Sequence, residues 1–118
     1  MKLKEFGNRY YFHDSFIESM NYDKGKASLT LIINFAFWMQ NDFVEGDEEN
    51  GLLEVTFHNV KSYECKGGDP TGDFVGILTT DVNHDTFVFN LLDDASSTFM
   101  KLKITATSVD AKKYKEQA

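Results

Sequence analysis

The residues in this sequence best suited to chemistry are its three histidines, two of which precede an aspartate. His13-Asp14 and His84-Asp85 are His-Asp pairs, and His58 lies alone in an alternating segment. Imidazole and carboxylate groups together form metal sites and acid–base pairs. However, the histidines lack the close spacing of metal ligands, and both pairs also fit turns in which aspartate accepts backbone hydrogen bonds. We therefore expect no catalytic residue, no bound metal and no cofactor.

The single cysteine and the glycine-rich segment indicate no further chemistry. Cys65 has Lys66 beside it but no identifiable base, and one cysteine forms neither an internal disulfide nor a cysteine-based zinc site. Residues 66–73 lack the Gly-Lys-Ser/Thr of a phosphate loop and the acid spacing of a calcium loop. Residues 1–12 contain no apolar run, so we expect no signal peptide, and no apolar run in the sequence is long enough to span a membrane. These features predict a soluble protein of the reducing cytoplasm with no membrane partner.

Acidic residues are concentrated in the middle of the chain. The net charge is −7 over 118 residues, which argues against nucleic acid as a partner because phosphate binding needs lysine and arginine. Residues 27–100 carry two lysines against thirteen acids. The densest part, called here the acidic segment, contains Asp42, Glu45, Asp47, Glu48 and Glu49. Two interpretations remain open: a solvated loop that limits aggregation, or a negative surface that attracts a basic protein partner.

Several aromatic residues are better candidates for surface rings than for core rings. Trp38 and Tyr63 are the main candidates, and Tyr10, Tyr11 and Tyr22 share the property. Such rings anchor protein partners or line a ligand groove. They lie among acids, which does not fit a nucleic-acid stacking platform.

Apolar and polar residues alternate along most of the chain, as they do in half-buried β-strands. Residues 27–39 form the longest alternating run, and we expect them to be the longest strand. A turn in which Gly25 accepts a positive φ pairs this strand with residues 16–22. The second range also fits a helix, because Ser15 and Glu18 form a capping-box pattern. The strand is the favoured interpretation.

The same alternation continues to the end of the chain. We expect further strands over residues 52–65, 73–82, 86–92 and 99–109, separated by polar or glycine-rich turns. Residues 111–118 have helix-forming side chains but little apolar surface, so we expect a short helix or a frayed tail there.

We therefore predict a single, mainly β domain spanning residues 1–118. Its strands form an antiparallel meander of about six, folded as a sandwich, a barrel or a strongly curved sheet, with at most one or two short helices. One apolar face of each strand forms the core, which we expect to bury Leu31, Ile33, Phe35, Phe57, Phe87, Phe89, Leu102 and Ile104. The chain is expected to be a monomer or a homodimer.

Part of the sequence resembles a group of known proteins. The stretch YFHDSFIESM over residues 11–20, the L-x-L-x-I pattern at 29–33 and the L-x-V-x-F-x-x-V pattern at 53–60 carry the resemblance. They are similar to small uncharacterised bacterial proteins with an F-H-D-S/A-x-I element, some of which are immunity proteins of contact-dependent or polymorphic toxin systems. The resemblance covers about the first half of the chain. It implies a β-rich domain with a protein-binding role, and it implies no catalytic residues.

Three hypotheses about function remain open. The leading one is a non-enzymatic protein-interaction domain, in its specific form an immunity protein that neutralises a basic toxin through an acidic surface. The alternative is a small-ligand-binding β domain, which a deep pocket containing Trp38 or Tyr63 would favour. The least favoured is a hydrolase or metal enzyme built on the His-Asp pairs, for which His13, His58 and His84 would have to converge.

Overall fold

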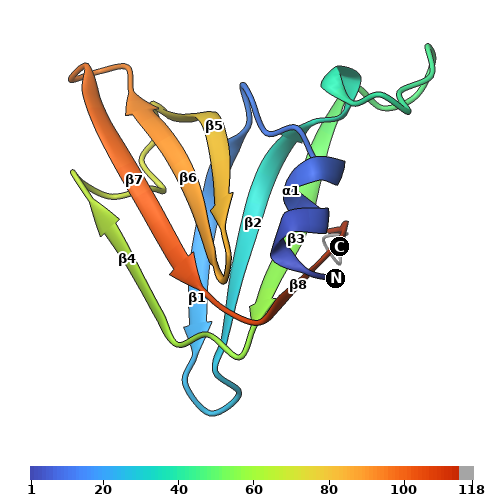
Figure 1. Cartoon of the computed structure of the whole chain (residues 1–118). Coiled ribbons are helices and arrows are strands. Elements are labelled where there is room, and N and C mark those ends of the chain that lie inside the picture. Colours follow the sequence, from blue (N-terminus) through green and yellow to red (C-terminus); the bar gives the residue numbers. More distant parts are fainter. Residues whose placement is uncertain (115–118) are drawn as a thin grey trace.

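The structure is a computed structural model that describes residues 1–114, and within them the chain forms eight strands and two short helices. In chain order these are α1 (Leu3–Arg9), β1 (Phe16–Asp23), β2 (Ser28–Ala36), η1 (Phe37–Met39), β3 (Asn50–His58), β4 (Ser62–Lys66), β5 (Val75–Asn83), β6 (Thr86–Asp93), β7 (Thr98–Thr105) and β8 (Ser108–Lys113). They form two antiparallel four-stranded sheets, ordered β1-β2-β3-β8 and β4-β7-β6-β5 (Figure 1). The predicted mainly β, antiparallel class is confirmed, and the sheets do not close into a barrel.

Two of the expected strands bend in the middle, so each contributes to both sheets. β3 and β4 are separated by three residues, the first of which, Asn59, has a left-handed backbone with φ 53°. β7 and β8 are separated by Ala106 and Thr107, which lie beside the break between β3 and β4. The Lys61 N–H donates to the Thr105 carbonyl at 2.8 Å, and the Thr107 N–H donates to the His58 carbonyl at 3.1 Å. The pairing therefore continues around the bend, and β4 runs back toward the end from which β3 came (Figure 1).

The core lies between the two sheets. All eight side chains predicted to form it are at most 1% exposed. Phe57 of β3 packs against Phe87 and Phe89 of β6, with ring centroids 5.7 and 6.5 Å apart. The period-two pattern thus identified the inward face of both sheets.

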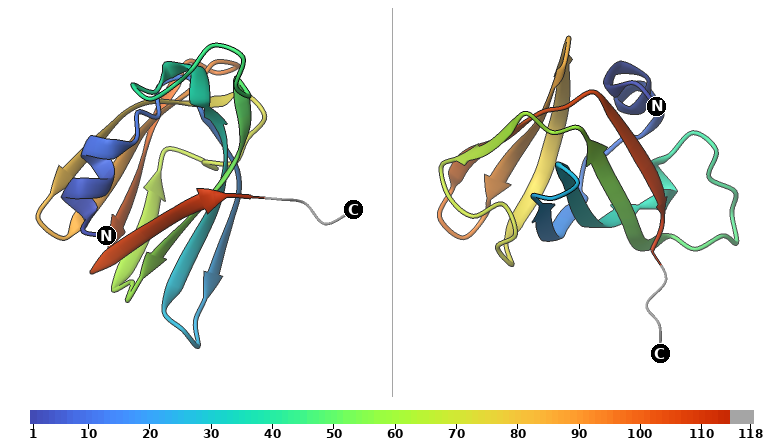
Figure 2. Two further views of the ribbon diagram at one scale, coloured as in Figure 1. Left: turned by 90° about the vertical axis from the view of Figure 1, so that its right-hand side faces the viewer. Right: turned by 90° about the horizontal axis from the view of Figure 1, so that it is seen from below.

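The short helix α1 contacts β5 and β8 and covers one side of the core (Figure 2). Leu3 and Phe6, three residues apart on one helix face, are both buried. Glu5 in the first turn and Arg9 in the last turn interact favourably with the helix dipole. A Cβ at Gly7 would lie 2.8 Å from Cγ2 of Val82, so the glycine permits this close approach to β5. No helix within residues 1–114 is long and apolar enough to cross a membrane.

The expected strand over residues 27–39 is shorter than predicted. β2 ends at Ala36, and η1 takes up the last three positions. Ala36 is the last residue of β2 that pairs with β3, and its N–H donates to the Ser15 hydroxyl at 3.2 Å and not to a neighbouring strand. With nine residues β2 has the same length as β3 and β5, so the prediction of a single longest strand is wrong.

Two smaller predictions also need correction. The positive φ in the β1–β2 turn lies at Ala27 (φ 49°) and not at Gly25, because the Ala27 carbonyl accepts the Val60 N–H at 2.8 Å. Residues 111–113 belong to β8 and are not helical, since they pair with β3. The rest of the predicted tail, residues 115–118, lies outside the described part of the chain. The expected strand over residues 16–22 is confirmed as β1.

Candidate interaction surface

Four connecting segments meet at one end of the molecule, and we call them together the loop end: residues 10–15, 37–49, 67–74 and 94–97 (Figure 1, upper side). Hydrogen bonds join residues 10–15 to residues 37–49, and residues 67–74 to residues 94–97. The Gln40 side chain donates to the Tyr11 carbonyl at 2.7 Å and accepts the Tyr11 N–H at 2.9 Å. The Asp14 N–H donates to the Ile77 carbonyl, and the Asp94 N–H donates to the Phe74 carbonyl. The four segments therefore lie together at one end of the fold, as two hydrogen-bonded pairs with β5 bonded to residues 10–15.

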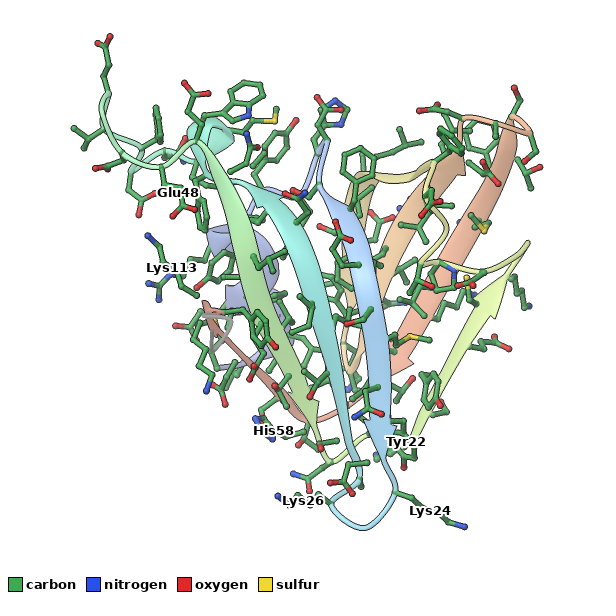
Figure 3. All side chains as sticks on the ribbon, turned by 180° about the vertical axis from the view of Figure 1, so that it is seen from behind. Tyr22, Lys24, Lys26, Glu48, His58 and Lys113 are labelled. Carbon is green, nitrogen blue, oxygen red and sulfur yellow. The ribbon has the colours of Figure 1, made fainter. Side chains whose placement is uncertain are left out.

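The loop end is uniformly acidic. Its four segments carry no lysine or arginine and nine acidic side chains, all of them exposed: Asp14, Asp42, Glu45, Asp47, Glu48, Glu49, Asp69, Asp73 and Asp94. The turns at the other end carry Lys24, Lys26 and Lys61. Figure 3 shows Glu48 at one end of the molecule, with Lys24 and Lys26 at the opposite end. The negative charge of the chain is thus concentrated on one end of the fold.

Most of the exposed large apolar side chains lie on or beside the same loops. Of the eight such residues in the described chain, all but Tyr63 and Tyr114 are here: Tyr11, Phe16, Trp38, Val44, Phe74 and Phe99. Trp38 is 48% exposed, and its backbone N–H donates to the Glu49 carbonyl at 3.1 Å. This bond holds the backbone of Trp38 beside the end of the acidic segment.

A groove of about 610 Å³ separates the acidic segment from α1 and β8. Its walls include Asp42, Asp47 and Glu48 on one side and Arg9, Lys112 and Lys113 on the other, with apolar contributions from Tyr10, Phe35, Phe37, Phe43 and Leu53. The Lys113 ammonium lies 4.9 Å from the centroid of the Phe37 ring. Cations of the chain itself therefore already face this side of the acidic segment, and its other side faces solvent.

The two aromatic residues singled out from the sequence do not come together. Trp38 belongs to η1 at the loop end and does not line the groove. Tyr63 lies on β4, packs against Tyr22 with ring centroids 5.1 Å apart, and borders a surface hollow of about 550 Å³ between polar side chains. Tyr63 is thus separate from the acidic segment.

The three histidines have separate surroundings. His13 Nδ1 lies 2.9 Å from the Leu78 carbonyl, and its Nε2 is 3.6 Å from the Asp14 carboxylate. His84 occupies the β5–β6 turn with φ 60°. His58 lies 2.8 Å from Asp110 on β8, a pair that no sequence motif indicated. Among residues 1–114, no group of three or more His, Cys, Asp and Glu side chains is arranged to hold a metal ion.

Three ionisable groups, all outside the acidic segment, have shifted pKa values. Hydrogen bonds from Thr71 lower the pKa of Asp69. The hydrogen bond from His58 lowers the pKa of Asp110. Partial burial, together with the nearby Asp69 carboxylate, raises the pKa of the Cys65 thiol. A raised thiol pKa disfavours the thiolate, which is the nucleophilic form. None of these arrangements builds a nucleophile with an adjacent base.

The alternating pattern did not reveal that Phe16, Phe74 and Phe99 share a surface with the acidic segment. The available signal was the absence of lysine and arginine from several connecting segments at once. Comparison of the chain with protein-family models, curated proteins and solved structures finds no match. The function is therefore inferred from the chain's own surface.

Proposed function

We propose that this chain is a non-enzymatic protein-interaction domain that binds a basic protein through the loop end, with the acidic segment and Trp38 at the centre of the contact. The observation that carries the proposal is the coincidence of nine exposed acids, no lysine or arginine, and exposed apolar rings on or beside the loops at one end of the fold. Charge alone would fit a solubility device. The rings give the surface the second component that binding needs.

The two components have different physical roles. Complementary charge around a contact speeds the encounter and selects oppositely charged partners. Large apolar side chains that become desolvated at the centre of a contact slow dissociation. Trp38 and Val44, which flank Asp42, the first acid of the acidic segment, are exposed apolar residues within the negative surface. This arrangement of apolar centre and charged rim is typical of protein–protein contacts.

The specific form of the proposal is an immunity protein that neutralises a basic toxin. A toxin that cleaves nucleic acid binds phosphates with lysine and arginine. Carboxylates of the acidic segment can occupy the same basic side chains and so exclude the substrate. The resemblance over the first half of the chain supports this form.

A second candidate function is suggested by the groove between the acidic segment and β8. Its aromatic side chains and its facing acidic and basic groups suit a small ligand with both charged and apolar parts. A small-molecule screen followed by NMR would support it if hits shift resonances of Tyr10 and Phe43 and lose affinity in Phe37→Ala. Hits confined to other surfaces would contradict it.

The proposal is tested by capture and identification of the partner in lysate of the native host. Immobilised wild type should retain a protein of high isoelectric point, and the triple variant Asp47→Asn, Glu48→Gln, Glu49→Gln should retain several-fold less of it. The matched control changes three acids outside the loop end: Glu5→Gln, Glu64→Gln and Asp85→Asn. Equal retention by the two triple variants, or an acidic captured protein, would contradict the proposal.

A further inference from the structure

Three exposed phenylalanines form a second apolar surface at the loop end, on the side away from Trp38, and we call Phe16, Phe74 and Phe99 with Leu92 the phenylalanine patch. Phe99 on β7 lies opposite Leu92 on β6, and Leu92 lies opposite Gly76 on β5. A Cβ at Gly76 would lie 3.4 Å from the Phe16 ring. The Phe16 ring, which belongs to the other sheet, thus lies over β5 where no side chain intervenes.

The phenylalanine patch exposes large apolar side chains to solvent. Phe99 is 71% exposed, Phe74 is 62% exposed and Phe16 is 39% exposed. Single exposed apolar residues are ordinary in soluble proteins, whereas adjoining ones mark contact surfaces. The inward neighbours Val75, Leu91 and Met100 already fill the core beneath. Phe74 and Phe99 therefore add little to this core, while Phe16 covers Gly76 with part of its ring and exposes the rest.

Charge around the patch indicates what kind of surface covers it. Asp73 precedes Phe74, and Asp94 donates its N–H to the Phe74 carbonyl at 3.0 Å. Lys66 and Lys101 adjoin Phe99 on the other flank. A second copy of the chain placed symmetrically on this end would bring together the nine loop-end acids of each chain. Lys66 and Lys101 offset these acids only in part, so the contact is repulsive on balance. A basic surface would meet the acids favourably.

We infer that the phenylalanine patch is a contact surface for the same basic protein partner, which presents to it an apolar side chain flanked by lysine or arginine. This inference rests on the proposed function and extends it across the loop end. The partner then contacts the acidic segment and the phenylalanine patch together, joined by Tyr11 and the loop over residues 10–15. It is a basic protein with an apolar component and not simply a polycation.

Two peptides of equal charge test the inference on the full chain. One alternates five arginines with four leucines, RLRLRLRLR, and the other alternates five arginines with four serines, RSRSRSRSR. We expect wild type to bind the leucine peptide about tenfold more tightly, equivalent to about 1.4 kcal/mol. The double variant Phe74→Ser, Phe99→Ser should reduce this preference to less than about twofold. Tyr114→Ser, an exposed aromatic change away from the patch, should keep it.

The outcomes separate this inference from the proposed function. Equal binding of both peptides, or a leucine preference that survives in the double variant, would overturn the phenylalanine patch as a contact surface and leave the acidic surface intact. No binding of either peptide at low salt would instead contradict the attraction of cations on which the proposed function depends. Sedimentation of the unbound wild type should show no dimer that depends on Phe99. A dimer that Phe99→Ser dissociates would instead assign the phenylalanine patch to a second copy of the chain.

Discussion

At the scale of single residues, stability depends on aromatic rings that meet between the sheets. Phe57 is fully buried, and its ring packs against Phe6 as well as against two rings of β6. Rings in this arrangement contribute through the apolar area they bury and through edge-to-face contacts. The alternation of the sequence was sufficient to predict Phe57 as a core residue, because its neighbours in the pattern are polar.

Phe57→Ala should lower the free energy of unfolding by about 3–5 kcal/mol, as large-to-small aromatic changes in a core do. Phe99→Ala is the matched change at an exposed position and should cost less than about 1 kcal/mol. Chemical denaturation followed by fluorescence measures both. A cost below about 1 kcal/mol for Phe57→Ala would place this ring outside the core.

The lowered pKa of Asp110 gives a pH dependence with a definite sign. Its carboxylate accepts a hydrogen bond from His58, so the folded state holds the charged form in preference, and the pKa lies below its ordinary value of 3.8. The stabilisation is therefore present above pH 3.8 and is lost as the pH falls through the lower, folded-state pKa. The effect is small because Asp110 is exposed.

Asp110→Asn should consequently be less stable than wild type near neutral pH, and this difference should disappear in acid. Urea denaturation at about pH 7 and about pH 2 compares the two conditions. A difference that stays constant or grows in acid would show that the carboxylate charge does not stabilise the fold.

At the scale of elements, the strands were predictable where the pattern had a simple physical origin. Strands β2, β6 and β7 alternate between an inward apolar face and an outward, mostly polar face, with Leu92 and Phe99 among the outward exceptions. α1 was not located, because seven residues with a central glycine carry a weak helical signal. β8 has one fully buried side chain, Val109, and its lysines suggested a tail.

A substitution at Gly7 tests whether α1 packs closely against β5. Gly7→Ala would raise helix propensity by about 1 kcal/mol in an isolated helix. Here its Cβ would meet Cγ2 of Val82 at 2.8 Å, so we expect a net destabilisation of about 1–3 kcal/mol from overpacking. In the background of Val82→Ala, Gly7→Ala should become neutral or stabilising. A stabilising effect in wild type would contradict the close helix–strand contact.

At the scale of the whole molecule, bends in the strands decide which loops share a surface. Six straight antiparallel strands would place successive connections at alternate ends, so the acidic segment and residues 67–74 would lie on opposite ends. The bend at Asn59 turns β4 back and brings both connections to the same end. The acidic segment was predictable as a contiguous run of charge. The complete loop end was not, because its acids and rings meet only through this bend.

The most direct test of the central claim is the association rate with the identified basic partner, measured at low and physiological salt. We predict that Asp47→Asn, Glu48→Gln, Glu49→Gln lowers the low-salt association rate about fivefold or more and weakens its dependence on salt, with dissociation nearly unchanged. The control triple Glu5→Gln, Glu64→Gln, Asp85→Asn removes the same charge elsewhere and should have a much smaller effect. Equal slowing by both triples, or no slowing by either, would contradict binding through the loop end.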